Sequence, residues 1–570
     1  MRWTSLAWLL ALSLNPWPAE AGIQDKCEAA ASALAEFPAL PQAPRAWLKG
    51  LDAWRLPARN TLNEAYVLAD LSPDAAERRA ARQCIQRLGQ AFDTVRPRIR
   101  REARQRLAGA RGLEKRALSL WAGGTGTPDG PAYRQAKAEA RRLSRQFRHT
   151  IDKAEPKAVL PLACAGNLKD NWRRQDGWHI PLPAPTATYH RLASDHCRQS
   201  LFVASESRLE KENGPVLTQL LAQRQQMAEL KGKSNYAELR LAGGQLNSPD
   251  AVWAFLDRLS ADNRERAETQ WQAAGQPPLW APPRVTFQHR FRYRPERVID
   301  GWLDHLSDEL GLRFVATAKA AWHPDVLHYE VFRDGRLLGE LYLDLYRRDG
   351  KYGHNRHREL RRGVTGVQTP ASVLALSLPR KRWGVKHLKS LLHESGHALN
   401  NLLASQPYQI LAGIRLPSEL VEVPAKVLER LAWDPAAHHR ITGQRRTPEP
   451  DPRQYGVALD ERILKAALAL AYHEGAPDRS AMDTINRRLY RAYLRRPLLD
   501  GMAPQYSFRH LASYGPNYVS YLHADHLAER LGARLANNSL SLRGFSHCLL
   551  SAGGSRPGRD QLACALGETP

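Results

Sequence analysis

The chain has 570 residues, of which 43% are hydrophobic and 25% are charged. This length and composition exclude a minimal peptide-like module, a collagen-like chain and an intrinsically disordered one, and they predict a large globular protein. The 83 Lys and Arg residues outnumber the 58 Asp and Glu residues, so the net charge is +25. Such a charge attracts polyanions at low salt, but it says nothing about the fold.

The first 21 residues have the pattern of a secretory signal peptide. Arg2 provides a basic start, an apolar run follows from Leu6 to Leu14, and Ala19-Glu20-Ala21 matches a small-x-small cleavage site before Gly22. The apolar run is far shorter than the roughly 20 residues that span a bilayer. We therefore expect an exported chain without a transmembrane segment, located in the periplasm or, as the alternative, secreted.

All six cysteines lie in the predicted mature part of the chain, and an even number in an oxidising compartment favours disulfides. None has the CxxC spacing of a redox motif or of a zinc site. The cysteines form three pairs that are close in sequence and far from one another, so we predict sequential bridges: Cys27–Cys84, Cys164–Cys197 and Cys548–Cys564.

The periodicity of apolar residues predicts a mostly α-helical chain. Residues 41–151 are rich in Arg and Ala and have helical spacing, whereas residues 155–200 are irregular and rich in proline. We expect an N-terminal helical region over residues 22–200 and a second region over residues 201–570.

The β signal is confined to the middle of the chain. Residues 326–332 and 337–346 flank Asp334-Gly335, which predicts a hairpin, and a further short strand follows at Ser372–Leu378. From Trp383 onward the pattern is helical, so the sequence predicts one small β-sheet in a large helical scaffold.

The sequence His393-Glu394-Ser395-Gly396-His397 is an HExxH motif in a helical apolar frame. Histidines four residues apart lie one turn apart on a helix, so both imidazoles can bind one Zn²⁺ ion. The carboxylate of Glu394 then lies beside the metal, where it can accept a proton from water.

A catalytic zinc needs a third protein ligand. Downstream of the motif, Glu419, Glu422 and Glu429 are the available carboxylates. Glu422 and Glu429 are seven residues apart and share a helix face, so one can bind zinc while the other orients a histidine. Spacing alone does not rank the three.

The motif and its surroundings resemble the thimet oligopeptidase and oligopeptidase A family of zinc metallopeptidases, which includes mitochondrial intermediate peptidase. Glu422 lies 29 residues after His393 in Val421-Glu422-Val423-Pro424, as in that family. The segment from Gly339 to His354 and the tyrosine-rich segment from Phe508 to Leu522 are also similar. Ser395 departs from the family, because a bulky apolar residue is usual at that position.

The resemblance implies a zincin-type fold with two lobes flanking a substrate channel, and one Zn²⁺ per chain. It implies His393, His397 and Glu422 as zinc ligands and Glu429 as the acid that orients a ligand. Ser372–Leu378 resembles the family's edge strand, which pairs with the substrate backbone. Besides the base Glu394, the residues expected to stabilise the oxyanion are His510, Tyr514, Tyr518 and Tyr521.

We therefore expect the region over residues 201–570 to be the catalytic part of an exported zinc oligopeptidase that cleaves internal bonds of short peptides. The alternative within enzymes is a dipeptidyl carboxypeptidase, which needs a cationic group for the substrate C-terminus. Non-catalytic alternatives are a peptide-binding protein and a basic envelope-binding protein with a structural zinc. No nucleic-acid motif is present, so no nucleic-acid partner is expected.

Two further groups of residues carry weaker expectations. The histidine pairs His354/His357, His438/His439 and His523/His526 lack a coherent acid partner and are interpreted as surface residues. Basic residues bracket the expected substrate strand and predict a preference for acidic peptides: Arg356, Arg358, Arg361, Arg362, Arg380, Lys381 and Arg382.

Overall fold

The computed structural model describes residues 22–123, 130–281, 291–417, 420–449 and 455–568. The expected signal peptide and one expected zinc-ligand alternative, Glu419, lie outside these residues. The contacts within the described chain form two compact units. Unit 1 comprises the described parts of residues 22–123, 291–449 and 527–568, and unit 2 comprises residues 130–281 and 455–526.

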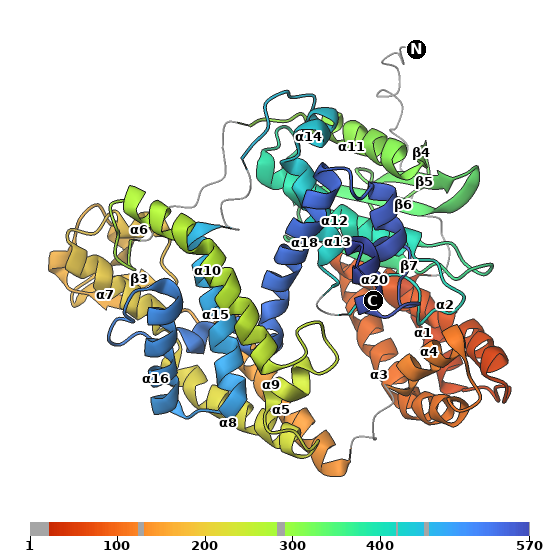
Figure 1. Cartoon of the computed structure of the whole chain (residues 1–570), viewed down its shortest axis with the longest axis horizontal. Coiled ribbons are helices and arrows are strands. Elements are labelled where there is room, and N and C mark those ends of the chain that lie inside the picture. The colour runs from red at the N-terminus through yellow and green to blue at the C-terminus, as the bar shows by residue number, and fades with distance from the viewer. Residues whose placement is uncertain (1–21, 124–129, 282–290, 418–419, 450–454, 569–570) are drawn as a thin grey trace. The chain divides into compact units, whose positions relative to one another are not determined.

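Helices dominate both units, as the periodicity predicts (Figure 1). Unit 1 contains α1 (Ile23–Ala35), α2 (Pro44–Leu71), α3 (Ala75–Arg106), α4 (Gly112–Ala122), α11 (Pro295–Leu310), α12 (Val385–Leu403), α13 (Val423–Glu429), α14 (Pro435–Thr442), α19 (Leu542–Phe545) and α20 (Gly558–Leu566). Unit 2 contains α5 (Pro131–Lys153), α6 (Thr186–Tyr189), α7 (Asp195–Glu206), α8 (Glu210–Glu229), α9 (Tyr236–Leu241), α10 (Pro249–Ala273), α15 (Gly456–Gly475), α16 (Arg479–Leu489) and α17 (Arg509–Ser513). Helix α18 (Ser520–Ala536) begins in unit 2 and ends in unit 1.

The main sheet lies in unit 1 and has five strands in the order β4-β5-β6-β8-β7. Its strands are β4 (Leu312–Thr317), β5 (Leu327–Arg333), β6 (Arg336–Tyr346), β7 (Arg356–Arg361) and β8 (Ala371–Leu378). The predicted hairpin is β5–β6. Asp334 and Gly335 at its turn have φ values of 50° and 75°, which suit the two-residue turn of a twisted hairpin.

The predicted strand Ser372–Leu378 exists as β8, but its expected edge position is wrong. β8 lies between β6, to which it is parallel, and β7, to which it is antiparallel. Almost all of its residues are buried, because helices cover both faces of the sheet. The edge strand at this end is β7. Its sequence Arg-His-Arg-Glu-Leu-Arg lacks the apolar residues by which a strand is recognised.

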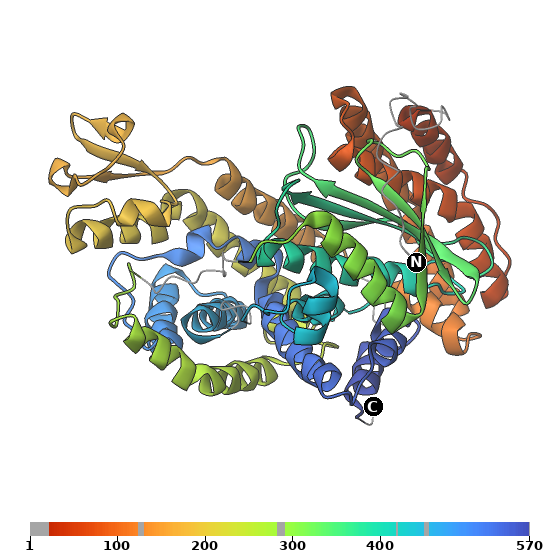
Figure 2. The same cartoon turned by 90° about the horizontal axis from the view of Figure 1, so that it is seen from above.

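Two layers of helices enclose the main sheet. Ala65 and Leu68 of α2 share a buried cluster with Val373 and Ala375 of β8, and Figure 2 shows the red N-terminal helices along one side of the green strands. On α12, Asn401 donates hydrogen bonds to the carbonyl of Ala371 and to Ser372 Oγ, 3.2 and 3.0 Å away. The helix with the HExxH motif is therefore anchored directly to β8.

Unit 2 is built around α15, which is apolar on nearly all sides. Its residues from Ile463 to Tyr472 are almost all buried against α8, α10 and the tyrosine-rich segment. A helix that is apolar all round is stable only when other elements surround it. Figure 1 shows α10 beside α15 in this arrangement.

Unit 2 also contains a second, three-stranded sheet in the region expected to be irregular. Its strands are β1 (Lys157–Leu160), β2 (Arg173–Arg174) and β3 (Gly177–Pro181), in the order β1-β3-β2. The prolines at the ends of these short strands concealed them.

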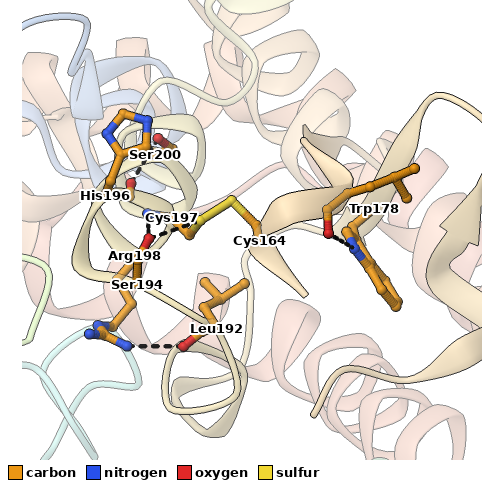
Figure 3. The surroundings of a disulfide bond; sticks show 9 residues. Cys164, Trp178, Leu192, Ser194, His196, Cys197, Arg198 and Ser200 are labelled. Atoms are coloured by element: carbon orange, nitrogen blue, oxygen red, sulfur yellow. Dashed lines mark hydrogen bonds between the residues drawn. A yellow bond between two sulfur atoms is a disulfide. The ribbon is translucent and has the colours of Figure 1, made fainter. Parts of the chain in front are cut away.

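The structure forms all three predicted disulfides. The bridge Cys164–Cys197 joins the small sheet region to α7 (Figure 3). Ser194 caps α7 by accepting a hydrogen bond from the backbone N–H of Cys197, 3.2 Å away. Nearby, Arg198 donates to the carbonyl of Leu192 at 3.1 Å, so hydrogen bonds also order the segment between the two cysteines. In the described part of the chain, no helix is both long and apolar enough to cross a membrane.

Candidate metal centre

Helix α12 carries the HExxH motif on its more buried half. At its start, His387 Nδ1 accepts a hydrogen bond from the backbone N–H of Gly384 at 2.9 Å, which satisfies one of the free N–H groups of a helix N-terminus. His393 and His397 lie one turn apart, and their ring centroids are 5.1 Å from each other. The two imidazoles therefore face the same side of the helix.

Gly396 allows α13 to approach this turn of α12. A Cβ atom at this position would lie 2.5 Å from Ala425 Cα and 2.7 Å from Ala425 N. Real Cβ atoms do not come so close to another backbone, so only glycine permits this contact. The close approach brings Glu422 and Glu429, at the two ends of α13, to the histidines.

Glu422 completes a group of three possible metal ligands. Its Oε2 lies 3.5 Å from Nε2 of His393 and 3.7 Å from Nε2 of His397. One ligand atom from each of the three residues lies within 4.8 Å of the others. Two imidazole nitrogens and one carboxylate oxygen are a ligand set that zinc prefers, and they leave a fourth position open.

Glu429 orients the first of these histidines. His393 Nδ1–H donates to Oε1 of Glu429 at 2.6 Å, which leaves Nε2 for a metal. Glu429 is 2% exposed, and its other oxygen pairs with Lys389 Nζ at 2.9 Å. Burial opposes ionisation of Glu429, but the hydrogen bond with His393 and the charges of Lys426 and Lys389 outweigh it and hold its pKa well below the usual range. The carboxylate is therefore ionised.

Glu394 lies next to the metal-binding side chains and is 8% exposed. Burial raises the pKa of its carboxyl group above the ordinary value, although His393 and His397 act in the opposite direction. A carboxylate with a raised pKa is a better proton acceptor than a solvated one.

The group of His393, His397 and Glu422 fits a zinc ion in donor type and in orientation. Nδ1 of His393 is hydrogen-bonded to Glu429, which leaves its Nε2 for a metal. This Nε2 and Nε2 of His397 both lie close to Oε2 of Glu422. This arrangement of imidazoles, carboxylate and orienting acid is characteristic of catalytic zinc sites.

The expected oxyanion-stabilising residues lie in unit 2 and form a cluster of their own. The ring centroids of His510 and Tyr514 are 5.5 Å apart, those of His510 and Tyr518 are 5.3 Å apart, and those of Tyr514 and Tyr521 are 5.0 Å apart. Tyr514 is 40% exposed. The catalytic role of the four residues stays a prediction.

Sequence reasoning missed the residue that holds this cluster in place. Arg224 of α8 is buried, and its guanidinium donates to the carbonyls of Leu511 and Ala512 at 2.6 and 2.7 Å. Gly515 has a φ of 55°, and a Cβ there would lie 3.2 Å from His473 Nε2 of α15. A lone arginine in an amphipathic helix gives no sequence signal for such a role.

The interpretation of the other histidine pairs as surface residues is wrong for two of these histidines, His438 and His523. His438 is fully buried and lies 3.1 Å from the hydroxyl of Tyr293, and His523 is 8% exposed. His357 of β7 lies 3.1 Å from Ser372 Oγ, and burial first, then the charge of His397, lowers its pKa to about 3. β7 is half-buried over most of its length, and its polar sequence gave no strand signal.

Most of the basic residues expected to select acidic peptides have acidic partners. Asp70 pairs with Arg356 and Arg358, Glu340 with Arg361, Glu359 with Arg362 and Asp325 with Arg380. These pairs offset much of the positive charge near β7 and β8. A preference for acidic peptides stays a prediction.

Comparison with known proteins agrees with this geometry. The family model of peptidase family M3 matches residues 188–276 and 285–570. The chain is 26% identical to human mitochondrial intermediate peptidase over 408 residues, which cover 62% of this chain and 55% of that protein. It is also 26% identical to oligopeptidase A of Escherichia coli (strain K12) over 458 residues, which cover 69% of this chain and 66% of that protein. The chain thus matches less than two thirds of the length of each relative.

Solved structures show the same fold. PZ peptidase A with an inhibitor aligns with a TM-score of 0.57 at 13% identity, covering 96% of this chain and 93% of that one. A putative oligoendopeptidase F aligns with a TM-score of 0.56 at 15% identity, covering 96% of this chain and 92% of that one. At these identities the likeness concerns the fold alone.

Proposed function

The chain belongs to peptidase family M3, and on that premise we propose that it is an exported, zinc-dependent oligopeptidase that hydrolyses internal bonds of short peptides. The observation that carries the proposal is the convergence of His393, His397 and Glu422 within 4.8 Å, beside the buried Glu394. A structural zinc site has four protein ligands, whereas this group supplies three.

The chemistry divides between the metal and the chain. When bound by His393, His397 and Glu422, zinc supplies a Lewis acid for the scissile carbonyl and for the attacking water. Glu394 accepts the proton of that water and transfers it to the leaving amine. Glu429 keeps His393 in the tautomer whose Nε2 faces the metal. We assign stabilisation of the oxyanion to His510 and Tyr514, with Tyr518 and Tyr521, as the family resemblance implies.

Export and the oxidising compartment form the second part of the proposal. The signal-like pattern of residues 1–21 supports export, and three disulfides are typical of proteins outside the cytosol. A periplasmic location accommodates both features, with secretion as the alternative.

The function is tested by measuring zinc content and cleavage of a quenched peptide library on the same preparation. The proposal expects one zinc per chain and internal cleavage that is lost with a chelator and restored by zinc. Removal of only C-terminal dipeptides would identify a dipeptidyl carboxypeptidase instead. Zinc without any cleavage would contradict the peptidase function. Fractionation of expressing cells tests the location, and a cytosolic product with an intact N-terminus would contradict export.

A further inference from the structure

Four arginines of unit 1 interact electrostatically with one another. Arg55 and Arg59 lie on α2, Arg362 follows β7, and Arg415 follows α12 in the chain. Burial first, and then the charges of the other arginines, lower the pKa of Arg55 and Arg415 to about 9 each. Burial first, and then the charge of Arg362, also lower the pKa of Arg59. These four guanidinium groups therefore repel one another. We call Arg55, Arg59, Arg362 and Arg415 the arginine cluster.

Two carboxylates offset only half of this charge. Glu359 Oε1 accepts from Arg362 Nε at 2.7 Å and lies 3.7 Å from Arg59 Nη2. Asp52 is the other acid that interacts with the cluster, and one of its oxygens accepts from the backbone N–H of Gln409 at 2.7 Å. Among the described residues, these four cations and two anions leave two positive charges. In a partly buried site, unpaired charge is costly and requires a counter-ion.

Several donors of the cluster are buried without a partner in the described part of the chain. They are Nε of Arg59, Nε of Arg415 and Nε2 of Gln409. Gln409 is 1% exposed, and its Oε1 is occupied by Arg55 Nη1 at 2.7 Å, so its amide nitrogen is the end that lacks a partner. Buried N–H groups are nearly always satisfied in native proteins. These donors need a hydrogen-bond acceptor, and the excess of positive charge favours an acceptor with negative charge, although Asp52 Oδ1 also lacks a partner.

We propose that a small inorganic anion of halide size binds in the arginine cluster, where it accepts hydrogen bonds from Arg59, Arg415 and Gln409. The side chains of Glu359 and Arg362 are only 14% and 7% exposed, which favours a monatomic anion over a phosphate ester. A halide supplies the negative charge and several acceptor directions at once.

The anion would link two segments of unit 1, α2 and the chain that follows α12. Arg59 comes from α2, and Arg415 lies seven residues before Glu422 of the metal-binding group. Gly413, two residues before Arg415, has a φ of 72°, and a Cβ there would lie 3.1 Å from Oε2 of Glu359. A bound anion thus stabilises the segment that precedes α13. This inference concerns a site separate from the zinc ligands and does not depend on peptidase activity.

Thermal unfolding of the full-length protein tests the site. Sodium chloride and sodium gluconate are titrated at equal ionic strength, so that general screening is the same in both series. We expect chloride, but not gluconate, to raise the Tm along a saturating curve. Bromide should act like chloride. Equal effects of chloride and gluconate would overturn the proposal, and stabilisation by phosphate at far lower concentration than chloride would show that the ligand is not a halide.

Two variants separate this site from other basic residues. Arg415→Gln should weaken the apparent affinity for chloride at least about tenfold, because it removes a charged donor. Arg356→Gln is the matched control. Arg356 lies on β7, as Glu359 of the cluster does, but it pairs with Asp70, so this variant should keep the chloride response. An unchanged response in Arg415→Gln would contradict the assignment. If that variant does not fold, the site is tested by anomalous scattering from bromide-soaked crystals of the wild-type protein. The absence of a bromide peak among Arg59, Arg415 and Gln409 would overturn the proposal.

Discussion

Oε1 of Glu429 lies 2.6 Å from Nδ1 of His393, and the same carboxylate pairs with Lys389 and Lys426. The ionised Glu429 of α13 thus fixes the orientation of the His393 imidazole of α12, on the side opposite Nε2. We expect Glu429→Gln to reduce zinc affinity roughly 10- to 100-fold, because the neutral amide orients the histidine less well. Competition with a chelator measures this affinity. Glu77→Gln, at the exposed start of α3, is the control. Equal zinc affinity in Glu429→Gln and wild type would contradict the role.

Glu394→Gln tests the proton acceptor. It removes the base without removing a metal ligand, so we expect zinc content near wild type and kcat reduced by about 10² to 10⁴. His393→Ala and Glu422→Ala should instead lose zinc and activity together. Metal analysis and kinetics on the same preparations check both statements. Substantial activity in Glu394→Gln, or loss of zinc from it, would reject the assignment.

Gly396→Ala tests the close contact between α12 and α13. The added Cβ meets the backbone of Ala425 at 2.5 Å, so α13 must move and carry Glu422 and Glu429 with it. We expect a lower Tm and a large loss of zinc affinity. Gly89→Ala in α3 is the control, because nothing lies within 4 Å of its Cβ position, and it should be neutral or stabilising by about 0.5 to 1 kcal/mol. A Gly396→Ala variant with wild-type zinc affinity would contradict this view of the contact.

His305 predicts a pH dependence of stability. It lies on α11, is 6% exposed, and neither ring nitrogen has a hydrogen-bond partner among the described residues. Burial first, and then the charge of Arg440, lowers its pKa from 6.5 to about 4, against a smaller opposite effect of Asp434. Between these two values the unfolded chain binds the proton and the folded chain does not, so stability falls as the pH drops through this window.

The expected size of this effect is about 3 kcal/mol at pH 4, as an order of magnitude. The Tm measured between pH 7 and pH 4 should therefore fall less steeply in His305→Leu than in wild type. Parallel curves for the two proteins would show that His305 does not contribute.

Some of the fold could be predicted because its signals are local. The turn residues Asp334-Gly335 predict the β5–β6 hairpin, and the spacing of the six cysteines predicts the three disulfides that the structure forms. The order of strands in the sheet has no local signal. The family resemblance gave β8 the edge position that belongs to β7. The basic residues of β7 pair with acids of α2 and β6, so β7 was not recognised as an apolar strand.

The candidate site shows the same division. The HExxH spacing places two histidines and an acid on one helix turn from sequence alone. The choice among three downstream glutamates needed family resemblance, since it depends on how closely α13 approaches α12. The structure supplies that reason in Gly396, and it reveals Arg224 and the arginine cluster, whose roles depend on residues distant in sequence.

The division of unit 1 into separate chain segments has a consequence for the order in which the protein can fold. Val373 of β8, which packs with Leu68 of α2, is synthesised 305 residues later, and Leu550, whose carbonyl accepts from Asn400 of α12, comes almost at the end. The first helices must therefore wait with an uncovered apolar face, a state that favours aggregation. The Cys27–Cys84 bridge needs only the first 84 residues, so it can cross-link α1 and α3 before their partners emerge. On this view, that disulfide restrains the first helices while their later partners are still absent.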